Sequence, residues 1–474
     1  MTSTVLTDQQ VRKIHEESLR ILERIGISVG HPETLRRFAD AGAKVDFDKQ
    51  RVRLPEPLVT RALASAGKTF TLYGRDLDKT AAFGVGRRNY NSNAGQALWL
   101  DEVGAARRRC VLADVAAATR FADALDGLTI AGAMADPSDV PVPVRCVEVL
   151  ATQIRNTTKP VTFWFHNRAS ARFIVEMLIA LRGTAEDAEK YPLCSPLLEP
   201  ISPLRFPFDG VDLLYETARL NLPVAIGPMA QMGLSAPCSI AGTLAVENAE
   251  ILAGVCVTQI VRPGMPVCYG GICHAFDMST TQLIFAGPEQ AIFGVAMTQM
   301  GKRYGLPVYI NAGLTDAKRP DAQAGLESGV TLATGAAAGA DVFGHMGICG
   351  VDQGSSLDIL VLQDEVIGYT ERATRGIDSS DEAFGFDVLA AAGPGGSMLD
   401  TDHTSERFRS ELWFPRLLDR QFYQAWQDGG AASMEDRCRQ RKRALCAIQP
   451  MPLAVDTARD IDAVIAAARA ELLG

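Results

Sequence analysis

The stretch from Val308 to Gly347 constrains the fold of this chain more than any other. Val308–Asn311 is a short run of β-branched and aromatic residues, which predicts a buried strand. A polar loop follows, and Gln323–Ala338 then predicts a helix rich in Ala, Leu and Thr. Ala340–Gly344 predicts a second strand, which ends at His345. The stretch is therefore one βαβ unit, and in parallel α/β folds functional side chains gather where such strands end.

The same alternation recurs from residue 127 onward. Eight stretches predict strands: Leu128–Met134, Val161–His166, Leu193–Pro200, Val224–Met229, Val267–Cys273, Val308–Asn311, Asp341–His345 and Val388–Ala392. Helical patterns separate them. Eight β/α units predict a TIM (β/α)8 barrel over residues 127–396. An open doubly wound sheet is the alternative, but no G-x-G-x-x-G motif opens a helix after the first strand.

The two ends of the chain predict additions to this barrel. Residues 1–126 indicate an N-terminal α+β extension, and Thr7 with Gln10 resembles a capping box at the start of its first helix. Arg87–Gln96 is the one polar loop of the extension that could line a site, although a solvated turn explains it equally well. Residues 397–474 predict a C-terminal helical tail packed on the barrel.

Charge and cysteine usage exclude several classes of protein. A net charge of −9 argues against nucleic acid or an anionic membrane as a partner. Ten cysteines without a C-x-x-C pair favour reduced, buried thiols, and we expect no metal site. The sequence shows no apolar run of about 18 residues and no signal-peptide pattern, so we expect a cytoplasmic protein.

Strand ends supply the candidate catalytic residues. On a barrel they meet at one mouth, where we expect Glu199, Asn311, Asp316 and His345, with Glu199, Asp316 and His345 as the catalytic groups. Gly393–Gly396 would follow the eighth strand, where barrels often bind phosphate, and a tight turn explains these glycines equally well.

Several separated motifs together resemble the trimethylamine methyltransferase (MttB-like) family. They are L-x-R-I-G-I-S-V from Leu22, G-P-E-Q from Gly287, G-L-T-D-A-K-R-P-D-A-Q-A-G-L-E from Gly313, G-P-G-G from Gly393 and D-H-T-S-E-R-F-R-S-E-L-W from Asp402. The resemblance covers Leu6 to about residue 450. It implies a TIM barrel that moves a methyl group from a methylated amine to the Co(I) corrinoid of a separate small protein.

The family's archaeal trimethylamine enzymes contain pyrrolysine inside the barrel, whereas this chain consists of ordinary residues only. Members without pyrrolysine resemble demethylases of quaternary amines such as glycine betaine, so the resemblance implies a substrate of that kind. The chain also lacks a D-x-H-x-x-G corrinoid-binding motif. We therefore expect no tightly bound cofactor, a corrinoid that arrives on a partner protein, and a homo-oligomer. Tetrahydrofolate is the alternative methyl acceptor.

A quaternary ammonium site needs aromatic faces and an anchor for the rest of the substrate. Candidate aromatic side chains are those of Trp164, Tyr90, Phe206 and Phe343. Candidate anchors for a substrate carboxylate are Lys318, Arg205, Gln323 and His345, and Asn311 is a further candidate substrate-binding residue. Two other functions stay open: a phosphate-binding barrel lyase or isomerase that uses Gly395 and Gly396, and a betaine-binding protein without catalysis.

Overall fold

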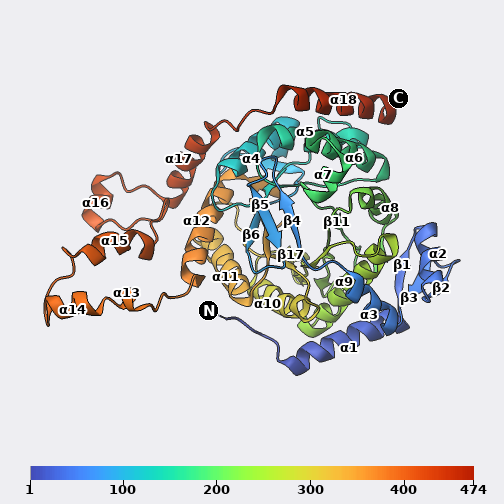
Figure 1. Cartoon of the computed structure of the whole chain (residues 1–474), viewed down its shortest axis with the longest axis horizontal. Coiled ribbons are helices and arrows are strands. Elements are labelled where there is room, and N and C mark those ends of the chain that lie inside the picture. Colours follow the sequence, from blue (N-terminus) through green and yellow to red (C-terminus); the bar gives the residue numbers. More distant parts are fainter. Residues whose placement is uncertain (1) are drawn as a thin grey trace.

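The computed structural model describes residues 2–474. Its centre is a set of eight short parallel strands, each followed by at least one helix. The strands are β6 (Asn89–Ser92), β9 (Ala131–Gly132), β10 (Val161–Thr162), β11 (Leu197–Leu198), β13 (Val224–Ile226), β15 (Val267–Gly271), β18 (Val308–Asn311) and β19 (Val342–Met346). The helices that follow them are α4 (Leu112–Ala124), α5 (Val142–Asn156), α6 (Arg168–Arg182) with α7 (Ala185–Lys190), α8 (Phe208–Thr217), α9 (Ile240–Val261), α10 (Pro288–Arg303), α11 (Ala322–Ala338) and α12 (Leu357–Thr374). These helices surround the strands (Figure 1).

Six of the strands form one parallel sheet in the order β11-β13-β15-β18-β19-β6, and β9 and β10 form a separate parallel pair. This pair lies between the two ends of the larger sheet. On one side the amides of Thr129 and Ile130 donate to the carbonyl of Tyr90, and on the other the amide of Val161 donates to the carbonyl of Leu193. The larger sheet therefore covers part of a barrel, and the β9–β10 pair connects its ends.

The eighth predicted strand, Val388–Ala392, is wrong. Helix α14 (Phe386–Ala392) occupies this segment and buries none of its residues. The strand that takes its place is β6, from the Arg87–Gln96 segment that we assigned to the extension. Parallel strands and their helices thus run from Asn89 to Thr374 instead of from residue 127 to residue 396.

Strand β6 reads N-Y-N-S, yet all four of its residues are buried. Hydrogen bonds to neighbouring strands explain how polar side chains tolerate this position. The Asn89 amide group donates to the carbonyls of Ala82 (2.8 Å) and Asp341 (3.1 Å). The amide N–H of Gly132 donates to Oγ of Ser92 at 2.7 Å. These bonds join β6 to β9 and to the start of β19.

The N-terminal elements close the amino end of the ring and pack on one side of it. They are α1 (Asp8–Arg24), β1 (Ile27–Val29), α2 (Pro32–Asp40), β2 (Lys44–Asp46), β3 (Arg51–Arg53), α3 (Glu56–Ser65), β4 (Phe70–Tyr73) and β5 (Thr80–Phe83). Strands β7 (Leu98–Leu100) and β8 (Arg108–Arg109) lie instead at the carboxyl end, where β7 pairs with β21 of the loop after β19. The predicted Thr7–Gln10 capping box at α1 is confirmed. The β4–β5 hairpin lies at the centre of the helix ring (Figure 1), where Leu72 and Phe83 pack against Ile130 and Tyr309.

The loops at the carboxyl ends of the central strands carry their own short strands: β12 (Arg205–Phe206), β14 (Gln231–Met232), β16 (His274–Asp277), β17 (Gln282–Ile284), β20 (Ile348–Cys349) and β21 (Gly354–Ser356). Helix α9 is the one helix among residues 2–474 that is long and apolar enough to cross a membrane, but 83% of its apolar window is buried inside the protein. Helix α9 is therefore a core helix.

The C-terminal segment contains α13 (Asp381–Phe384), α14, α15 (Asp402–Glu411), α16 (Tyr423–Asp428), α17 (Met434–Cys446) and α18 (Val455–Leu472). Helix α17 packs on α12 and α4, and α18 packs on α5 and α6. Residues 376–433 run outward from the ring (Figure 1) and expose large apolar side chains such as Ile377, Phe386 and Phe422. Gly393–Gly396 lie in this outer segment and not at a strand end, so the phosphate-site interpretation loses its basis.

Candidate active site

A cavity of about 120 Å³ lies at the carboxyl ends of the central strands. Its lining residues come from loops and strands around the ring: Asn93, Ala94, Gln96, Trp164, Leu197, Glu199, Met229, Ile272, Phe285, Asn311, His345, Ile348 and Asp352. Larger hollows of about 700 and 450 Å³ lie outside the ring, against α1 and α12 respectively. We place the candidate site in the smaller cavity, because the carboxyl ends of several central strands converge there with the side chains of Glu199, His345 and Asp352. Its volume suits a small compound.

Two carboxyl groups face this cavity. Glu199 follows β11 and is an exposed residue, although neighbouring protein partly desolvates its carboxyl group. Burial and the nearby charge of Asp352 raise the pKa of Glu199. Burial also raises the pKa of Asp352 to about 6, although the hydrogen bond from Gln96 opposes the shift. In that bond Nε2 of Gln96 donates to Oδ1 of Asp352 at 2.7 Å. The charge of Asp352 therefore disfavours ionisation of Glu199, in the same direction as burial.

Asp352 reaches the cavity from a strained turn between β20 and β21. Gly350, Val351 and Asp352 all have positive φ angles, of 65°, 62° and 57°. A β-branched residue such as Val351 rarely adopts this conformation, and non-glycine residues held there cost on the order of 1–3 kcal/mol each. Such strain is concentrated at functional sites, and here it aims one carboxyl group at the cavity.

His345 faces the cavity from β19, beside Trp164 and Tyr309. Its imidazole ring lies edge-on to Tyr309, with 5.4 Å between ring centroids, and its Nε2 is hydrogen-bonded to the Tyr309 hydroxyl. The Trp164 ring is 6.3 Å away, held by a 2.8 Å hydrogen bond from Nε1 to the carbonyl of Gly95. Burial lowers the pKa of His345 to about 4, so the imidazole is neutral at pH 7.

Asn311 and His274 form a second hydrogen-bonded pair at the cavity wall. Nδ2 of Asn311 lies 3.0 Å from Nε2 of His274, whose ring stacks on Phe285 with 4.7 Å between centroids. Burial and the neighbouring His345 lower the pKa of His274 to about 3. The other amide atom, Oδ1 of Asn311, has no hydrogen-bond partner within residues 2–474, although Asn311 is only 2% exposed. The wall therefore presents a buried, free acceptor.

Asp316 acts on this wall from behind. Its carboxylate accepts hydrogen bonds from the backbone amides of Phe285 (3.1 Å) and Ala286 (3.4 Å). It thereby holds the loop that presents Phe285 to His274 and to the cavity. Asp316 itself does not line the cavity. Asp316, which the sequence predicts as a catalytic residue, thus contacts the loop behind the wall and not the cavity.

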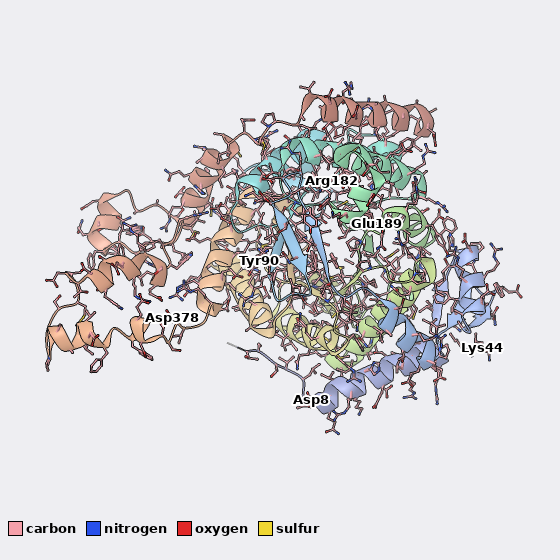
Figure 2. The ribbon with its side chains drawn as sticks, viewed as in Figure 1. Asp8, Lys44, Tyr90, Arg182, Glu189 and Asp378 are labelled. Carbon is pink, nitrogen blue, oxygen red and sulfur yellow. The ribbon has the colours of Figure 1, made fainter. Side chains whose placement is uncertain are left out.

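Four of the predicted residues meet at the cavity: Trp164, Glu199, Asn311 and His345. Tyr90 and Phe343 stack on each other instead, with 5.0 Å between centroids, outside the strand ring. The Tyr90 hydroxyl donates to Glu371 of α12. Figure 2 shows Tyr90 within the ring of helices. The pairing of β19 with β6 shifts register between Phe343 and Met346, and this irregularity turns Phe343 and His345 to opposite sides.

The remaining predicted residues also lie elsewhere. Arg205 and Phe206 form β12, which pairs with β1 of the N-terminal sheet. Lys318 is exposed, and its Nζ donates to the backbone carbonyl of Asp316. Gln323 is exposed at the start of α11, and its amide donates to Glu327. None of these four side chains lines the cavity, so the predicted basic anchor for a substrate carboxylate is not formed by them.

Sequence reasoning missed Asp352, Gln96, Phe285 and Tyr309. One signal for Asp352 was present: V-D-Q stands between Gly350 and Gly354 just beyond His345, a spacing typical of a tight turn next to a strand end. Gln96 and Asn93 belong to the polar loop Arg87–Gln96, for which a site-lining loop and a solvated turn were both open, and both residues line the cavity. No pattern singled out Phe285.

The chain is similar to known methyltransferases. It matches the family model described as trimethylamine methyltransferase (MTTB) over residues 1–473. A glycine betaine methyltransferase of Desulfitobacterium hafniense (strain Y51) is 32% identical over 424 residues, which cover 89% of this chain and 88% of that protein. A trimethylamine methyltransferase MttB of the same species (strain DSM 10664 / DCB-2) is 29% identical over 434 residues, or 91% of this chain and 87% of that protein. A solved monomethylamine methyltransferase of Methanosarcina barkeri has a TM-score of 0.48 at 11% identity, over 100% of this chain and 95% of that one, a likeness too weak to build on.

Proposed function

Because the chain belongs to the trimethylamine methyltransferase family, we propose that it removes a methyl group from a small quaternary amine and passes it to the Co(I) corrinoid of a partner protein. The D. hafniense relative makes glycine betaine the first compound to test. We also treat the eight strands from β6 to β19 as a (β/α)8 barrel whose carboxyl mouth receives both reactants. A cytoplasmic location and a homo-oligomer stay predictions.

One observation carries this proposal: a small cavity at the strand ends combines aromatic faces with carboxyl groups. Trp164 and Phe285 supply the aromatic faces, and each face contributes roughly 0.5–2 kcal/mol to binding of a cation. Glu199 and Asp352 supply the negative charge. A neutral His345 at pH 7 adds no opposing charge.

The chemistry needs these features and no general acid. When the N–CH₃ bond breaks, its electron pair stays on nitrogen, the methyl group leaves toward the nucleophile, and the amine departs neutral. The protein must therefore orient one methyl group toward the mouth and exclude water. Because the substrate's positive charge disappears in the transition state, a tighter cation cage would slow the reaction by favouring the bound substrate. Two aromatic faces are consistent with moderate binding.

A corrinoid cannot enter a cavity of about 120 Å³, so it would have to meet the methyl group at the mouth. The corrinoid supplies the nucleophile when its carrier protein docks. The residues of this chain hold the amine beneath it. Tetrahydrofolate is the alternative acceptor, which would need a cleft beside the cavity.

The test supplies each acceptor separately to the purified enzyme together with a panel of quaternary amines that includes glycine betaine. We expect a reduced corrinoid protein to become methylated, as read from its visible spectrum, and the demethylated amine to appear in equal amount. Methyl-tetrahydrofolate forming without any cobalamin protein would replace the corrinoid in our proposal. No methyl transfer from any amine to either acceptor would refute it.

A further inference from the structure

Resting on the proposed function, we infer that Glu199 and Asp352 make this site select quaternary ammonium cations that carry no carboxylate, such as choline, over betaines. The first argument is the charge of the lining. Within residues 2–474 no lysine or arginine lines the cavity, and both of its ionisable acids face inward. Two cationic side chains beside the Gly350–Gln353 turn are engaged elsewhere, since Lys318 donates to the Asp316 carbonyl and Arg107 donates to the Gln353 side chain.

The second argument is the supply of hydrogen-bond donors. A substrate carboxylate would need donors in the wall. The amide group of Gln96 donates to Asp352, that of Asn311 is paired with His274, and the Trp164 N–H donates to Gly95. Asn93 donates to the Met346 carbonyl and to Oγ of Ser355. The donors in the wall are therefore largely committed to protein partners.

The third argument concerns the hydrogen-bond acceptors in the wall that have no protein partner. Oδ1 of Asn311 is a buried acceptor without a partner within residues 2–474, and the Glu199 carboxyl group, which lines the cavity, has no hydrogen bond in the same part of the chain. Free acceptors attract the polarised methyl groups of a cation and repel a carboxylate. Charge and hydrogen bonding thus favour the same class of ligand.

Ionisation of the acid pair sets the strength of this selection. Glu199 and His345 line the cavity with Asp352, Tyr309 and His274 lie behind its wall, and Arg107 and Lys318 lie beside the Gly350–Gln353 turn. His345 and His274 have lowered pKa values, and Tyr309 has a raised one, so all three are neutral near pH 7. Asp352 gains its charge as the pH rises through about 6. Selection for a cation should therefore strengthen from pH 5 to pH 8.

The test measures binding of choline and glycine betaine to the enzyme alone, by calorimetry at pH 5.5 and pH 7.5. The two ligands have the same trimethylammonium head and differ in an alcohol against a carboxylate. We expect choline to bind at least tenfold more tightly at pH 7.5, and the ratio to shrink at pH 5.5. Glu199→Gln and Asp352→Asn should each reduce the ratio at least threefold.

Glu186→Gln is the matched control, because Glu186 is an exposed carboxylate on α7, outside the cavity. It should leave the ratio unchanged, and unfolding temperatures should show that every variant is folded. Equal or tighter binding of glycine betaine to the parent enzyme would overturn the inference, as would a ratio that survives in the Glu199→Gln, Asp352→Asn double variant. If either result overturns the inference but the enzyme still transfers a methyl group from betaine, the proposed function stays intact. Selective binding of choline without methyl transfer from any amine would refute the function and keep the selectivity.

Discussion

Replacing Gly132 by alanine tests the assignment of β6 to the central ring. A Cβ atom at this position would lie 2.1 Å from the carbonyl oxygen of Asn93 and 2.3 Å from that of Ser92. Both are backbone atoms at the end of β6, so no side chain can swing away, and β9 and β6 must separate. Overpacking of this kind costs about 1–3 kcal/mol.

The separation also weakens the 2.7 Å hydrogen bond from the Gly132 amide to Oγ of Ser92. Losing that bond adds about 1 kcal/mol, for a total destabilisation of roughly 2–4 kcal/mol. With about 2.1 cal/mol/K of unfolding entropy per residue, the 474 residues give about 1 kcal/mol/K. We therefore expect the unfolding temperature to fall by about 2–4 °C.

The matched control is Gly325→Ala on α11, where an added Cβ meets no atom within 4 Å. Alanine is favoured over glycine in a helix by about 1 kcal/mol, so this variant should unfold at or slightly above the parent temperature. Differential scanning calorimetry compares the three proteins. If Gly132→Ala unfolds at the parent temperature or above it, β6 and β9 are not neighbours and the strand order is wrong.

Three further predictions concern the cavity. Burial raises the pKa of Asp352 to about 6, so the folded protein binds this proton more tightly than the unfolded chain does. The free energy of unfolding is therefore highest, as far as this group is concerned, below about pH 4, and it falls as the pH rises through 6. Asp352→Asn should therefore unfold about 2–3 °C above the parent at pH 8 and at the parent temperature at pH 4, and a difference that does not depend on pH would contradict this. His345→Ala should reduce methyl transfer at least tenfold with little change in unfolding temperature; turnover near the parent rate would make His345 structural. Asp316→Ala should reduce kcat/KM at least tenfold because the Phe285 loop is released, and Asp316→Asn, which keeps an acceptor oxygen, should recover most of it; equal losses in both variants would argue for a role of the charge.

Seven of the eight predicted strand positions contain a central strand, because those strands are apolar and separated by helices of ordinary length. The exception shows the limit of apolar patterning. Val388–Ala392 is apolar enough for a strand but forms an exposed helix, and a short apolar run fits either structure. Strand β6 is polar, and hydrogen bonds to residues far along the chain, such as Asp341, make its burial possible. No local pattern contains that information.

The candidate site likewise contains some residues that the sequence predicts and others that only the structure reveals. Glu199, Asn311 and His345 were predictable because they stand at strand ends, which a parallel fold brings together. Phe343, a candidate aromatic face for the substrate, stacks on Tyr90 instead, because the register shift in β19 separates it from His345 although residues two apart in a strand normally share a face. Asp352 depends on a backbone conformation that its residue type rarely adopts, so only the structure reveals it.

The pairing of β6 with β19 also determines the order in which the chain can fold during its synthesis. Strand β6 leaves the ribosome early, but β19, its partner on one side, begins at Val342. At about 5–20 residues per second, the intervening stretch of roughly 250 residues takes on the order of 10–50 s to appear. Throughout that interval one edge of β6 lacks its final partner, and an apolar edge would invite association with other nascent chains. A strand that reads N-Y-N-S presents asparagine and serine there instead, so the polarity that concealed β6 in the sequence also protects the unfinished protein.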